Sequence, residues 1–353
     1  MEAFKPFIAK AASGSSLSEH ETKCAFDLIF EGAVTPAQLG GFLLALRARG
    51  ETAEEIAGAV SALRQKMIRI VAPGGAIDIV GTGGDGQDTY NISTLAALIT
   101  AACGVPVAKH GNRAASSKSG ASDVLGALGV GLDLVPRELE ACLREAGICF
   151  MFACAHHPAI RHAAGVRAQL GTRTVFNLIG PLANPASAEY QLLGVFSRDW
   201  CEPLAHVLRK LGSNRAWVVH GSDGLDEATT TGPTFVTELF KDEIRSFEIV
   251  PEDAGIPRAP LRSLAGGGPA HNAAALDAVL GGAKGAYRDI AVLNAAIALI
   301  VAGKAEDLKH GALLAAGAID DGRAADTLAR LVKMSNRAAV PQAAGALHAA
   351  KVL

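Results

Sequence analysis

The chain has 353 residues, of which 50% are apolar, and its 33 Lys and Arg against 35 Asp and Glu leave a formal net charge of −2. This composition supports a large buried core, and the length allows two domains or one α/β domain with a helical addition. The balanced charge gives no global reason to expect a nucleic-acid or membrane partner, so any phosphate binding must occur at a local site.

Several features indicate a cytoplasmic protein. The first residues, MEAFKPFIAK, lack the long apolar segment of a signal peptide, and the longest apolar run, residues 290–302, is too short to cross a bilayer. The six cysteines include no CxxC pair, and most lie in apolar surroundings typical of reduced thiols in a protein core.

Residues 1–72 are predicted to form an all-helical domain. Three of its helices are predicted to begin at a capping box, in which Ser or Thr is followed three residues later by Glu or Gln; the boxes are Ser18–Glu21, Thr35–Gln38 and Thr52–Glu55. No catalytic constellation occurs here, which is typical of a packing or dimer surface. We expect the domain to end at Pro73–Gly75.

Residues 76–353 are predicted to form an α/β domain, because strand and helix patterns alternate there. This alternation favours a mostly parallel central sheet covered on both faces, with ligands beyond the carboxyl ends of the strands. The expected strands are Ile77–Val80, Val105–Ala108, Ile148–Phe152, Tyr190–Val195, Ala216–His220, Phe235–Leu239 and Ile244–Ile249. A glycine-rich turn is expected at Gly266–Pro269, followed by helices from Leu276 to Leu331 that cover the sheet.

A glycine-rich turn, Gly81–Gly86, follows the first expected strand and precedes a helical pattern. This arrangement presents backbone N–H groups to a phosphate, and glycine lets the backbone approach the anion closely. The loop lacks the Gly-Lys-Ser/Thr ending of a nucleoside-triphosphate loop, and Asp85 lies too early for a dinucleotide fingerprint. Asp85 indicates either a ligand reached through a bound metal or a loop organised by Asx hydrogen bonds. A strand–helix turn without a ligand remains the alternative.

The loop after the second expected strand, Lys109–Gly120, combines three cations, several hydroxyl groups and two glycines. These groups are suited to bind a polyanion, although a solvated surface loop has a similar composition. After the third strand come His156 and His157, whose side chains point apart as sequence neighbours, so we expect a pocket-lining histidine rather than a metal site.

Two further positions carry candidate ligand-binding groups. Arg167 could pair with a small carboxylate through its guanidinium, or it could be an ordinary arginine on a helix surface. The segment Asp223–Glu227 follows the fifth expected strand and holds consecutive carboxylates. Magnesium prefers a few carboxylates together with phosphate oxygens, so this segment is a candidate magnesium site, with an acidic turn as the alternative.

Together these motifs resemble those of the anthranilate phosphoribosyltransferase family, which is related to the pyrimidine nucleoside phosphorylases. The resemblance covers nearly the whole chain, and the motifs occur in the family's order. The matching segments are GTGGD at Gly81–Asp85, NIST at Asn91–Thr94, KHGNR at Lys109–Arg113, SSKSG at Ser116–Gly120, HHPA at His156–Ala159, VR to ANP at Val166–Pro185 and DGLDE at Asp223–Glu227.

The resemblance implies a small helical domain joined to a larger α/β domain, with a returning helical-domain segment near residues 165–187 and a homodimer formed through the helical domain. It also implies transfer of a 5-phosphoribosyl group from phosphoribosyl pyrophosphate to the amine of anthranilate, in the second step of tryptophan biosynthesis from chorismate. Because a neutral aromatic amine can attack without prior deprotonation, no dedicated general base is expected.

The resemblance also implies the residues of the site. Phosphoribosyl pyrophosphate would be held by Gly81, Gly84, Asp85, Thr89, Asn91, Ser93, Thr94, Lys109, Asn112, Arg113, Ser116, Ser117 and Ala121. Anthranilate would be bound by Gly81, His110, Asn112, His157, Arg167 and Pro181. Two magnesium ions per active site would be bound by Ser93, Asp226 and Glu227.

The chain departs from the family pattern at three of these motifs. Ala121 replaces a common Ser, which removes one hydroxyl contact, while Tyr90 replaces a common Phe and Gly165 a common Pro. Two alternatives stay open: a pyrimidine nucleoside phosphorylase of the same fold, and a non-enzymatic relative that binds nucleic acid. The intact magnesium and KHGNR motifs and the balanced charge oppose both.

Overall fold

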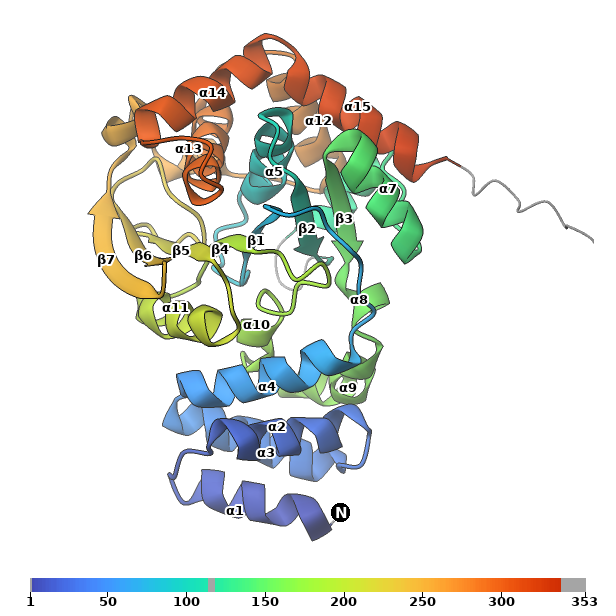
Figure 1. The fold of residues 1–353 in the computed structure, drawn as a ribbon. Coiled ribbons are helices and arrows are strands. Elements are labelled where there is room, and N and C mark those ends of the chain that lie inside the picture. The colour runs from blue at the N-terminus through green and yellow to red at the C-terminus, as the bar shows by residue number, and fades with distance from the viewer. Residues whose placement is uncertain (1, 114–117, 338–353) are drawn as a thin grey trace, which may run out of the picture.

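A computed structural model describes residues 2–113 and 118–337 (Figure 1). A small lobe of helices lies at the N-terminal end, and a larger lobe contains a sheet covered by helices. The small lobe is built from η1 (Glu2–Phe4), α1 (Lys5–Ala12), α2 (Glu19–Phe30), α3 (Pro36–Arg49) and α4 (Ala53–Lys66).

The three predicted capping boxes are confirmed at the starts of α2, α3 and α4. In each box the Ser or Thr hydroxyl accepts a hydrogen bond from the third helical N–H, and the Glu or Gln at that position binds the capping residue's own N–H. Glu55 makes two additional contacts: its buried carboxylate accepts a hydrogen bond from the Leu17 N–H at 2.9 Å and forms an ion pair with Arg49. The box at Thr52 thereby joins three segments of the small lobe.

The larger lobe contains a seven-stranded sheet in the order β3-β2-β1-β4-β5-β6-β7. The pairs among β1 to β5 are parallel, and β6 and β7 are antiparallel, so the mostly parallel sheet is confirmed. The strands are β1 (Ile77–Gly81), β2 (Val107–Gly111), β3 (Ile148–Phe152), β4 (Tyr190–Gly194), β5 (Arg215–Gly221), β6 (Thr234–Phe240) and β7 (Glu243–Ile249). Each expected strand is present, and β2 begins after Pro106, which has no N–H to donate to the sheet.

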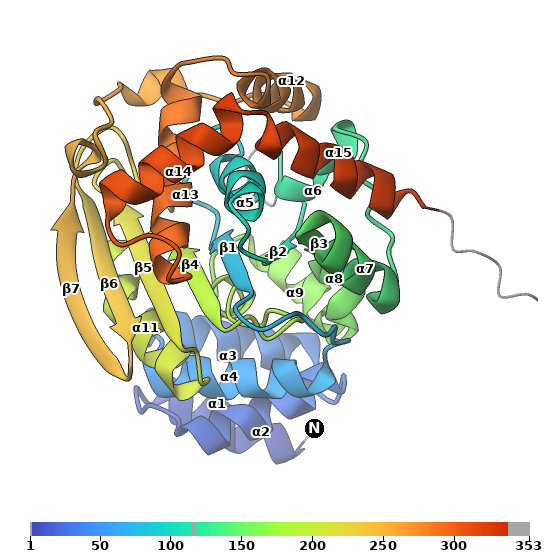
Figure 2. The same ribbon diagram turned by 45° about the horizontal axis from the view of Figure 1, so that its top comes forward.

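Helices cover both faces of the sheet (Figure 2). Residues along β5 alternate between two cores. Trp217 and Val219 pack with α5 (Ile92–Ala102) and α13 (Ala286–Val301), whereas Ala216 and Val218 pack with α11 (Cys201–Lys210). The α helices after β1 are α5 (Ile92–Ala102), α6 (Ala121–Ala127), α7 (Pro136–Ala146), α8 (Ala153–His156), α9 (Arg161–Leu170), α10 (Phe176–Ile179), α11 (Cys201–Lys210), α12 (Pro269–Leu280), α13 (Ala286–Val301), α14 (Leu308–Asp320) and α15 (Arg323–Ser335). The 3₁₀ helices are η2 (Pro158–Ile160), η3 (Arg198–Trp200), η4 (Pro251–Ala254) and η5 (Leu261–Leu264).

The segment between β3 and β4 returns to the small lobe, where α9 packs against α2 and α3, and α10 packs against α4 (Figure 1). The Phe176 ring lies 5.7 Å from the Phe26 ring and 6.2 Å from the Phe30 ring, centre to centre. The apolar core of the small lobe is therefore continuous with the face of the sheet that α11 covers.

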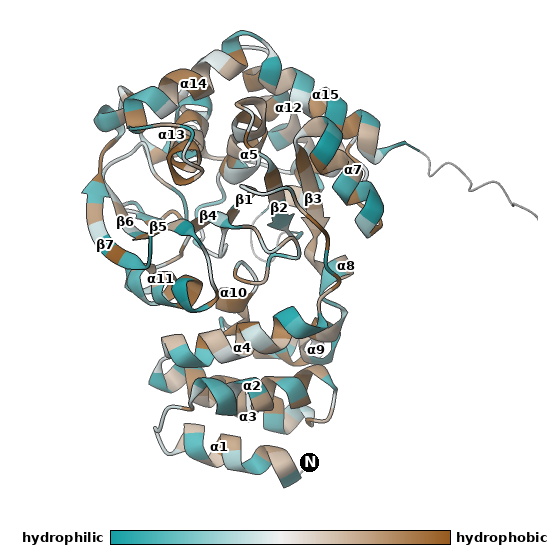
Figure 3. Ribbon diagram, in the orientation of Figure 1, coloured by the Kyte–Doolittle hydropathy of each residue, from teal (hydrophilic) through white to brown (hydrophobic). Residues whose placement is uncertain are grey.

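Helix α12 begins at Pro269, earlier than the expected helical start at Leu276, because Pro at the first helical position follows the extended Gly268. Helix α13 is apolar along most of its length and is buried against α5 and α14 (Figure 3). None of the helices in the described part of the chain combines the length and the apolar character that crossing a membrane requires.

Candidate active site

Several of the predicted site residues converge where the order of the sheet reverses, between β1 and β4. Ligands of open α/β sheets bind at such a point, beyond the carboxyl ends of the strands. Gly81 ends β1, Gly194 ends β4, and Asp226 lies against both. A Cβ atom on either glycine would overlap Asp226, so both positions require glycine. Gly194 was not among the predicted site residues.

The glycine loop has the backbone conformation that its composition predicts. Gly83, Gly84 and Gly86 have φ angles of +67°, +74° and +77°, which glycine adopts without strain. The Gly83 N–H donates to Asp226 Oδ2 at 2.6 Å, and Asp85 Oδ1 accepts from the Gln87 N–H at 3.2 Å. The second contact is the Asx turn, one of the two explanations predicted for an acid in this loop.

Asp226 and Glu227 form a half-buried pair of carboxylates beside the start of α5. The Ser93 N–H donates to Glu227 Oε1 at 3.2 Å. Burial raises the pKa of Asp226, and the negative charge of Asp85 raises it further. Burial likewise raises the pKa of Glu227, with the charge of Asp226 as the next cause. The raised pKa values indicate that nearby positive charge does not fully balance the negative charge of the pair.

Lys109 supplies positive charge close to this pair. Its ammonium group donates to the Ile79 carbonyl at 2.6 Å and to Ser93 Oγ at 3.2 Å, and the side chain is buried. Burial lowers the pKa of Lys109, while the charges of Asp78, Glu227 and Asp226 oppose that change. Lys109 thus links β1 and α5, and it is surrounded by more carboxylates than its single charge can balance.

The donor groups here fit a magnesium ion. Two carboxylates and the Ser93 hydroxyl are hard oxygen ligands, and the raised pKa values of Asp226 and Glu227 reflect charge that a divalent cation would balance. Within residues 2–113 and 118–337, no group of three or more His, Cys, Asp or Glu side chains is arranged to hold a metal. A cation at this pair would therefore need further ligands, such as the phosphate oxygens of a substrate.

Asn91 connects the start of α5 to distant segments. Its amide group donates to the Ser119 carbonyl at 3.2 Å and accepts from Asn272 at 2.9 Å, and its backbone carbonyl accepts from Tyr287 at 3.2 Å. Asn272 and Tyr287 support this corner, yet nothing local in the sequence had singled out Tyr287.

The neighbouring predicted residues of this stretch, Thr89 and Thr94, are held in different ways. Thr89 forms a bridge with Ala265, and the Tyr90 N–H donates to the Leu264 carbonyl at 3.0 Å. The segment after η5 therefore holds the end of the glycine loop. The Thr94 hydroxyl is buried without a partner among the described residues, so its side chain faces the interior.

The imidazole rings of His110, in β2, and His157, after α8, contact each other. Their Nε2 atoms lie 3.2 Å apart, and both rings are buried. Burial lowers the pKa of His110 well below its usual value and the pKa of His157 to about 4, so both imidazoles are neutral at pH 7. His156 instead contacts the Ile68 carbonyl through Nδ1 at 2.7 Å. The two adjacent histidines therefore point apart, as expected.

A network of buried hydrogen bonds holds the loop that carries Pro181. Asn184 donates to Asp78 Oδ2 at 2.7 Å and to the Ala108 carbonyl at 2.9 Å, while Asp78 Oδ1 accepts from the His110 N–H at 3.1 Å. The Pro181 carbonyl accepts from Gln191 at 2.8 Å. This loop is thereby fixed to β1, β2 and β4.

Arg64 fixes the same loop from the helical lobe. Its Nη2 and Nε atoms donate to the Leu182 carbonyl at 2.7 and 3.0 Å, and Nη1 donates to the Leu211 carbonyl at 3.3 Å. The residue next to Pro181 is therefore bound by a side chain from α4.

The remaining predicted residues lie around this centre. The Arg167 guanidinium, on α9, lies 5.0 Å from the centre of the Phe176 ring and makes no hydrogen bond or ion pair within the described residues. Asn112 and Arg113 are exposed after β2, and Ala121 begins α6. Ser116 and Ser117 lie outside the described residues. The structure thus joins Gly81, Ser93, Lys109, Asp226 and Glu227 directly, whereas Arg167 is not bonded to that group.

Comparisons with known proteins agree with this architecture. Residues 73–325 match a family model described as the glycosyl transferase family a/b domain, and residues 5–67 match its helical bundle domain. An anthranilate phosphoribosyltransferase of Methylocella silvestris is 67% identical over 98% of this chain and 99% of its own length. One from Beijerinckia indica is 65% identical over 96% of this chain and 98% of its own length.

Solved structures give the same result. Anthranilate phosphoribosyltransferase from Thermus thermophilus superposes with a TM-score of 0.89 at 45% identity, covering 93% of this chain and 99% of that one. The Saccharomyces cerevisiae enzyme in complex with PRPP and Mg superposes with a TM-score of 0.87 at 29% identity, covering 95% and 98%. The chain therefore belongs to the anthranilate phosphoribosyltransferase family of glycosyl transferases.

Proposed function

We propose that the chain transfers the 5-phosphoribosyl group of phosphoribosyl pyrophosphate to the amine of anthranilate and releases pyrophosphate, the second step of tryptophan biosynthesis from chorismate. The observation that carries this proposal is the convergence of the glycine loop, Ser93, Lys109 and the Asp226–Glu227 pair at the β1–β4 reversal. The names of the relatives support the same activity.

The donor is proposed to bind along the carboxyl ends of β1 and β2. Backbone N–H groups of the glycine loop and the start of α5 would bind phosphate oxygens, together with residues 109–117 and the backbone of Ala121. Breaking the bond between C1 of ribose and the pyrophosphate oxygen places negative charge on the leaving group. Lys109, already beside the carboxylates, is positioned to stabilise that charge.

Magnesium is proposed as the cofactor, with two ions per active site held by Ser93, Asp226 and Glu227. When bound, it would neutralise charge on the pyrophosphate group. The Mg-bound yeast relatives support its identity. The carboxylates themselves orient the site through their bonds to the Gly83 and Ser93 N–H groups.

Anthranilate is proposed to bind between the returning segment and the Lys109 loop. Arg167 would pair with the carboxylate of anthranilate, because a guanidinium donates two parallel hydrogen bonds to such a group. Neutral His110 and His157, together with Gly81, Asn112 and Pro181, would line the path of the aromatic ring. The amine nucleophile needs no base, so positioning and exclusion of water would supply much of the rate.

The domain organisation is part of the same proposal. Residues 1–72, with the returning segment near 165–187, would form the helical domain, and residues 76–353 the α/β domain. The two family models, which match residues 5–67 and 73–325, support this division. We also propose a cytoplasmic homodimer formed through the helical domain, and closure of the two domains about residues 73–75 as a gate.

The fluorescence of anthranilate during turnover tests this function. We expect it to decrease only when phosphoribosyl pyrophosphate and magnesium are both present, and to stay constant after addition of a chelator. Constant fluorescence in the complete mixture, with the protein folded, would contradict the proposed acceptor. Phosphorolysis of pyrimidine nucleosides in a parallel assay would instead indicate the nucleoside phosphorylase alternative.

A further inference from the structure

A second arginine of the returning segment, Arg173, reaches the glycine loop. Its Nε and Nη2 atoms lie 3.4 and 3.5 Å from the position that a Cβ atom on Gly84 would occupy. The guanidinium carbon lies 4.2 Å from the centre of the Phe196 ring. Arg173 therefore lies between the turn of the glycine loop and an aromatic face.

The aromatic residue that supports Arg173 is itself attached to the glycine loop. The Phe196 N–H donates to Thr82 Oγ1 at 3.1 Å, and the Thr82 N–H donates to the Gly194 carbonyl at 2.9 Å. The position of the guanidinium is thus set by the loop and the end of β4, although Arg173 belongs to the segment that packs on the helical lobe.

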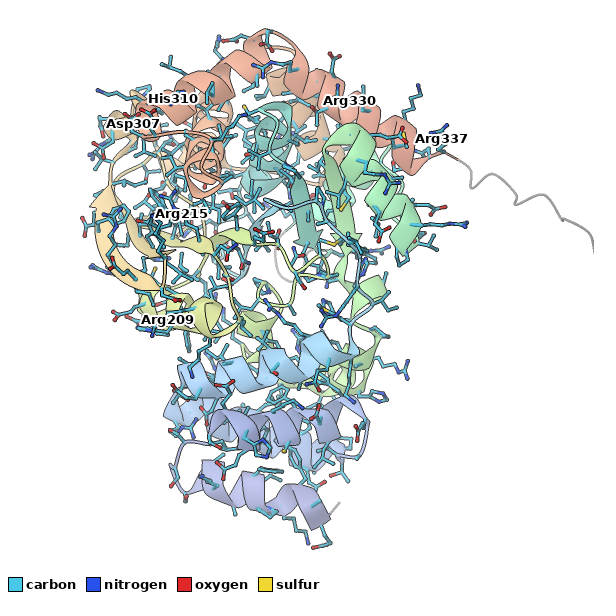
Figure 4. All side chains as sticks on the ribbon, in the orientation of Figure 1. Arg209, Arg215, Asp307, His310, Arg330 and Arg337 are labelled. Carbon is cyan, nitrogen blue, oxygen red and sulfur yellow. The ribbon has the colours of Figure 1, made fainter. Side chains whose placement is uncertain are left out.

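The N–H groups of Arg173 have no acceptor among residues 2–113 and 118–337. Arg215, which is also partly buried and is labelled in Figure 4, donates instead to Glu238 at 2.7 and 3.0 Å and to the Ile300 carbonyl at 2.7 Å. Stacking on an aromatic face restricts a guanidinium and leaves its edge available to an acceptor. A planar fork of this kind matches phosphate oxygens.

We propose that Arg173 donates hydrogen bonds to the diphosphate group of bound phosphoribosyl pyrophosphate. This inference rests on the proposed function and adds a donor-binding residue from the returning segment. Each arginine would then bind a different substrate: Arg173 the diphosphate of the donor and Arg167 the carboxylate of anthranilate. Because α9 and α10 pack on the helical lobe, a donor held by Arg173 also ties that lobe to the glycine loop.

Isothermal titration of phosphoribosyl pyrophosphate in the presence of magnesium tests the proposal without requiring turnover. We expect Arg173→Ala to weaken donor binding by about 10- to 100-fold, the range for lost hydrogen bonds to a charged group. Arg173→Lys keeps the positive charge but not the planar guanidinium, so its donor affinity should lie between those of wild type and Arg173→Ala. Phe196→Leu removes the stacking surface and should weaken binding to a smaller extent. Arg161→Ala, an exposed arginine on α9, is the matched control and should bind like wild type.

A steady-state assay gives the second readout. With donor saturating, Arg173→Ala should leave the KM for anthranilate within about twofold of wild type. Unchanged donor affinity in Arg173→Ala, while wild type binds the donor, would overturn the role of Arg173 and leave the proposed function standing. Absence of donor binding by wild type would overturn both. If Arg173→Ala does not fold, Arg173→Lys decides between the first two results.

Discussion

The two proposed substrate sites are built in different ways. The donor side uses short segments at neighbouring strand ends: Gly81, Ser93, Lys109 and the Asp226–Glu227 pair are joined by direct contacts within the larger lobe. The acceptor side uses the returning segment, whose backbone is held by side chains from several elements, including α4 of the helical lobe.

This difference concerns charge as well as architecture. The donor side contains half-buried carboxylates: burial raises the pKa values of both, the charge of Asp85 raises that of Asp226 further, and the charge of Asp226 raises that of Glu227. The negative charge of the donor side is therefore only partly balanced. The acceptor side contains neutral histidines and a stacked arginine, and its organisation depends on backbone carbonyls that accept hydrogen bonds. We therefore expect changes on the donor side to affect catalysis and magnesium, and changes on the acceptor side to affect anthranilate and stability.

The largest expected effect is on the donor side. The double variant Asp226→Asn, Glu227→Gln should lose about 10³-fold or more in turnover, because groups that stabilise the leaving pyrophosphate are removed. Removal of two neighbouring like charges, which repel each other, should leave the apo protein at least as stable as wild type. Turnover across a magnesium titration, together with thermal unfolding, measures both effects.

An exposed acid provides the control for that variant. Glu248→Gln, on the outer strand β7, should retain wild-type turnover and magnesium dependence. If the double variant kept more than a tenth of wild-type turnover at every magnesium concentration, the carboxylates would not belong to the donor site.

Arg167→Ala tests the other side. Loss of a guanidinium that pairs with a carboxylate should raise the KM for anthranilate by about 10- to 100-fold, while the affinity for phosphoribosyl pyrophosphate stays unchanged. Steady-state kinetics with each substrate varied in turn separates the two. An equal loss of donor affinity and anthranilate affinity would contradict this assignment, because Arg167 would then serve both sites.

Local sequence predicted the donor side because its signals are contiguous. The glycine run, the residues before α5 and the DGLDE segment each carry their chemistry within a few positions, and parallel strands bring their carboxyl ends together. The capping boxes and each expected strand were predicted for the same reason. Gly194 lacked such a signal, since the need for glycine there comes from Asp226, a residue of another loop.

The acceptor side could be predicted only in part. Arg167 and the His156–His157 pair were singled out from their residue types and Pro181 through the family resemblance. The bond between Asn184 and Asp78, however, spans 106 residues, and the bond between Arg64 and Leu182 spans 118. No periodicity or spacing in the sequence indicates such pairs. The early start of α12 was missed for a different reason, because the glycines before Pro269 favoured a turn although Pro at the first helical position is a local start signal.

Arg64→Ala tests how far the helical lobe supports the anthranilate side. The Leu182 carbonyl would lose two hydrogen bonds from a charged donor, which should cost about 2 kcal/mol of stability. The loop that carries Pro181 would be less well positioned, so the KM for anthranilate should rise a few-fold while donor affinity is retained. Urea unfolding and steady-state kinetics measure these effects. Unchanged stability would show that water replaces the guanidinium without loss.

The smallest expected effect is a change in the pH dependence of stability. Burial raises the pKa of Asp78 from its ordinary 3.8 to about 6, although hydrogen bonds from Asn184 and the charge of Lys109 oppose the rise. Because the folded protein then binds a proton more tightly than the unfolded chain, Asp78 contributes stability below pH 4, and this contribution is lost as the pH rises through 6. Asp78→Asn lacks this titration. The melting temperature of the variant minus that of wild type should therefore increase as the pH rises from 4 to 7.

The experiment compares thermal unfolding of the two proteins at closely spaced pH values in the absence of magnesium. His110 and His157 are present in both, so their titration cancels in the difference between the melting temperatures. The absolute stability of Asp78→Asn also includes the changed contact with Asn184, so the slope of the difference with pH, rather than its size, reports the buried carboxylate. Parallel curves would mean that Asp78 stays ionised throughout, with Lys109 as its effective counterion, and the acceptor side would then share the charge organisation of the donor side.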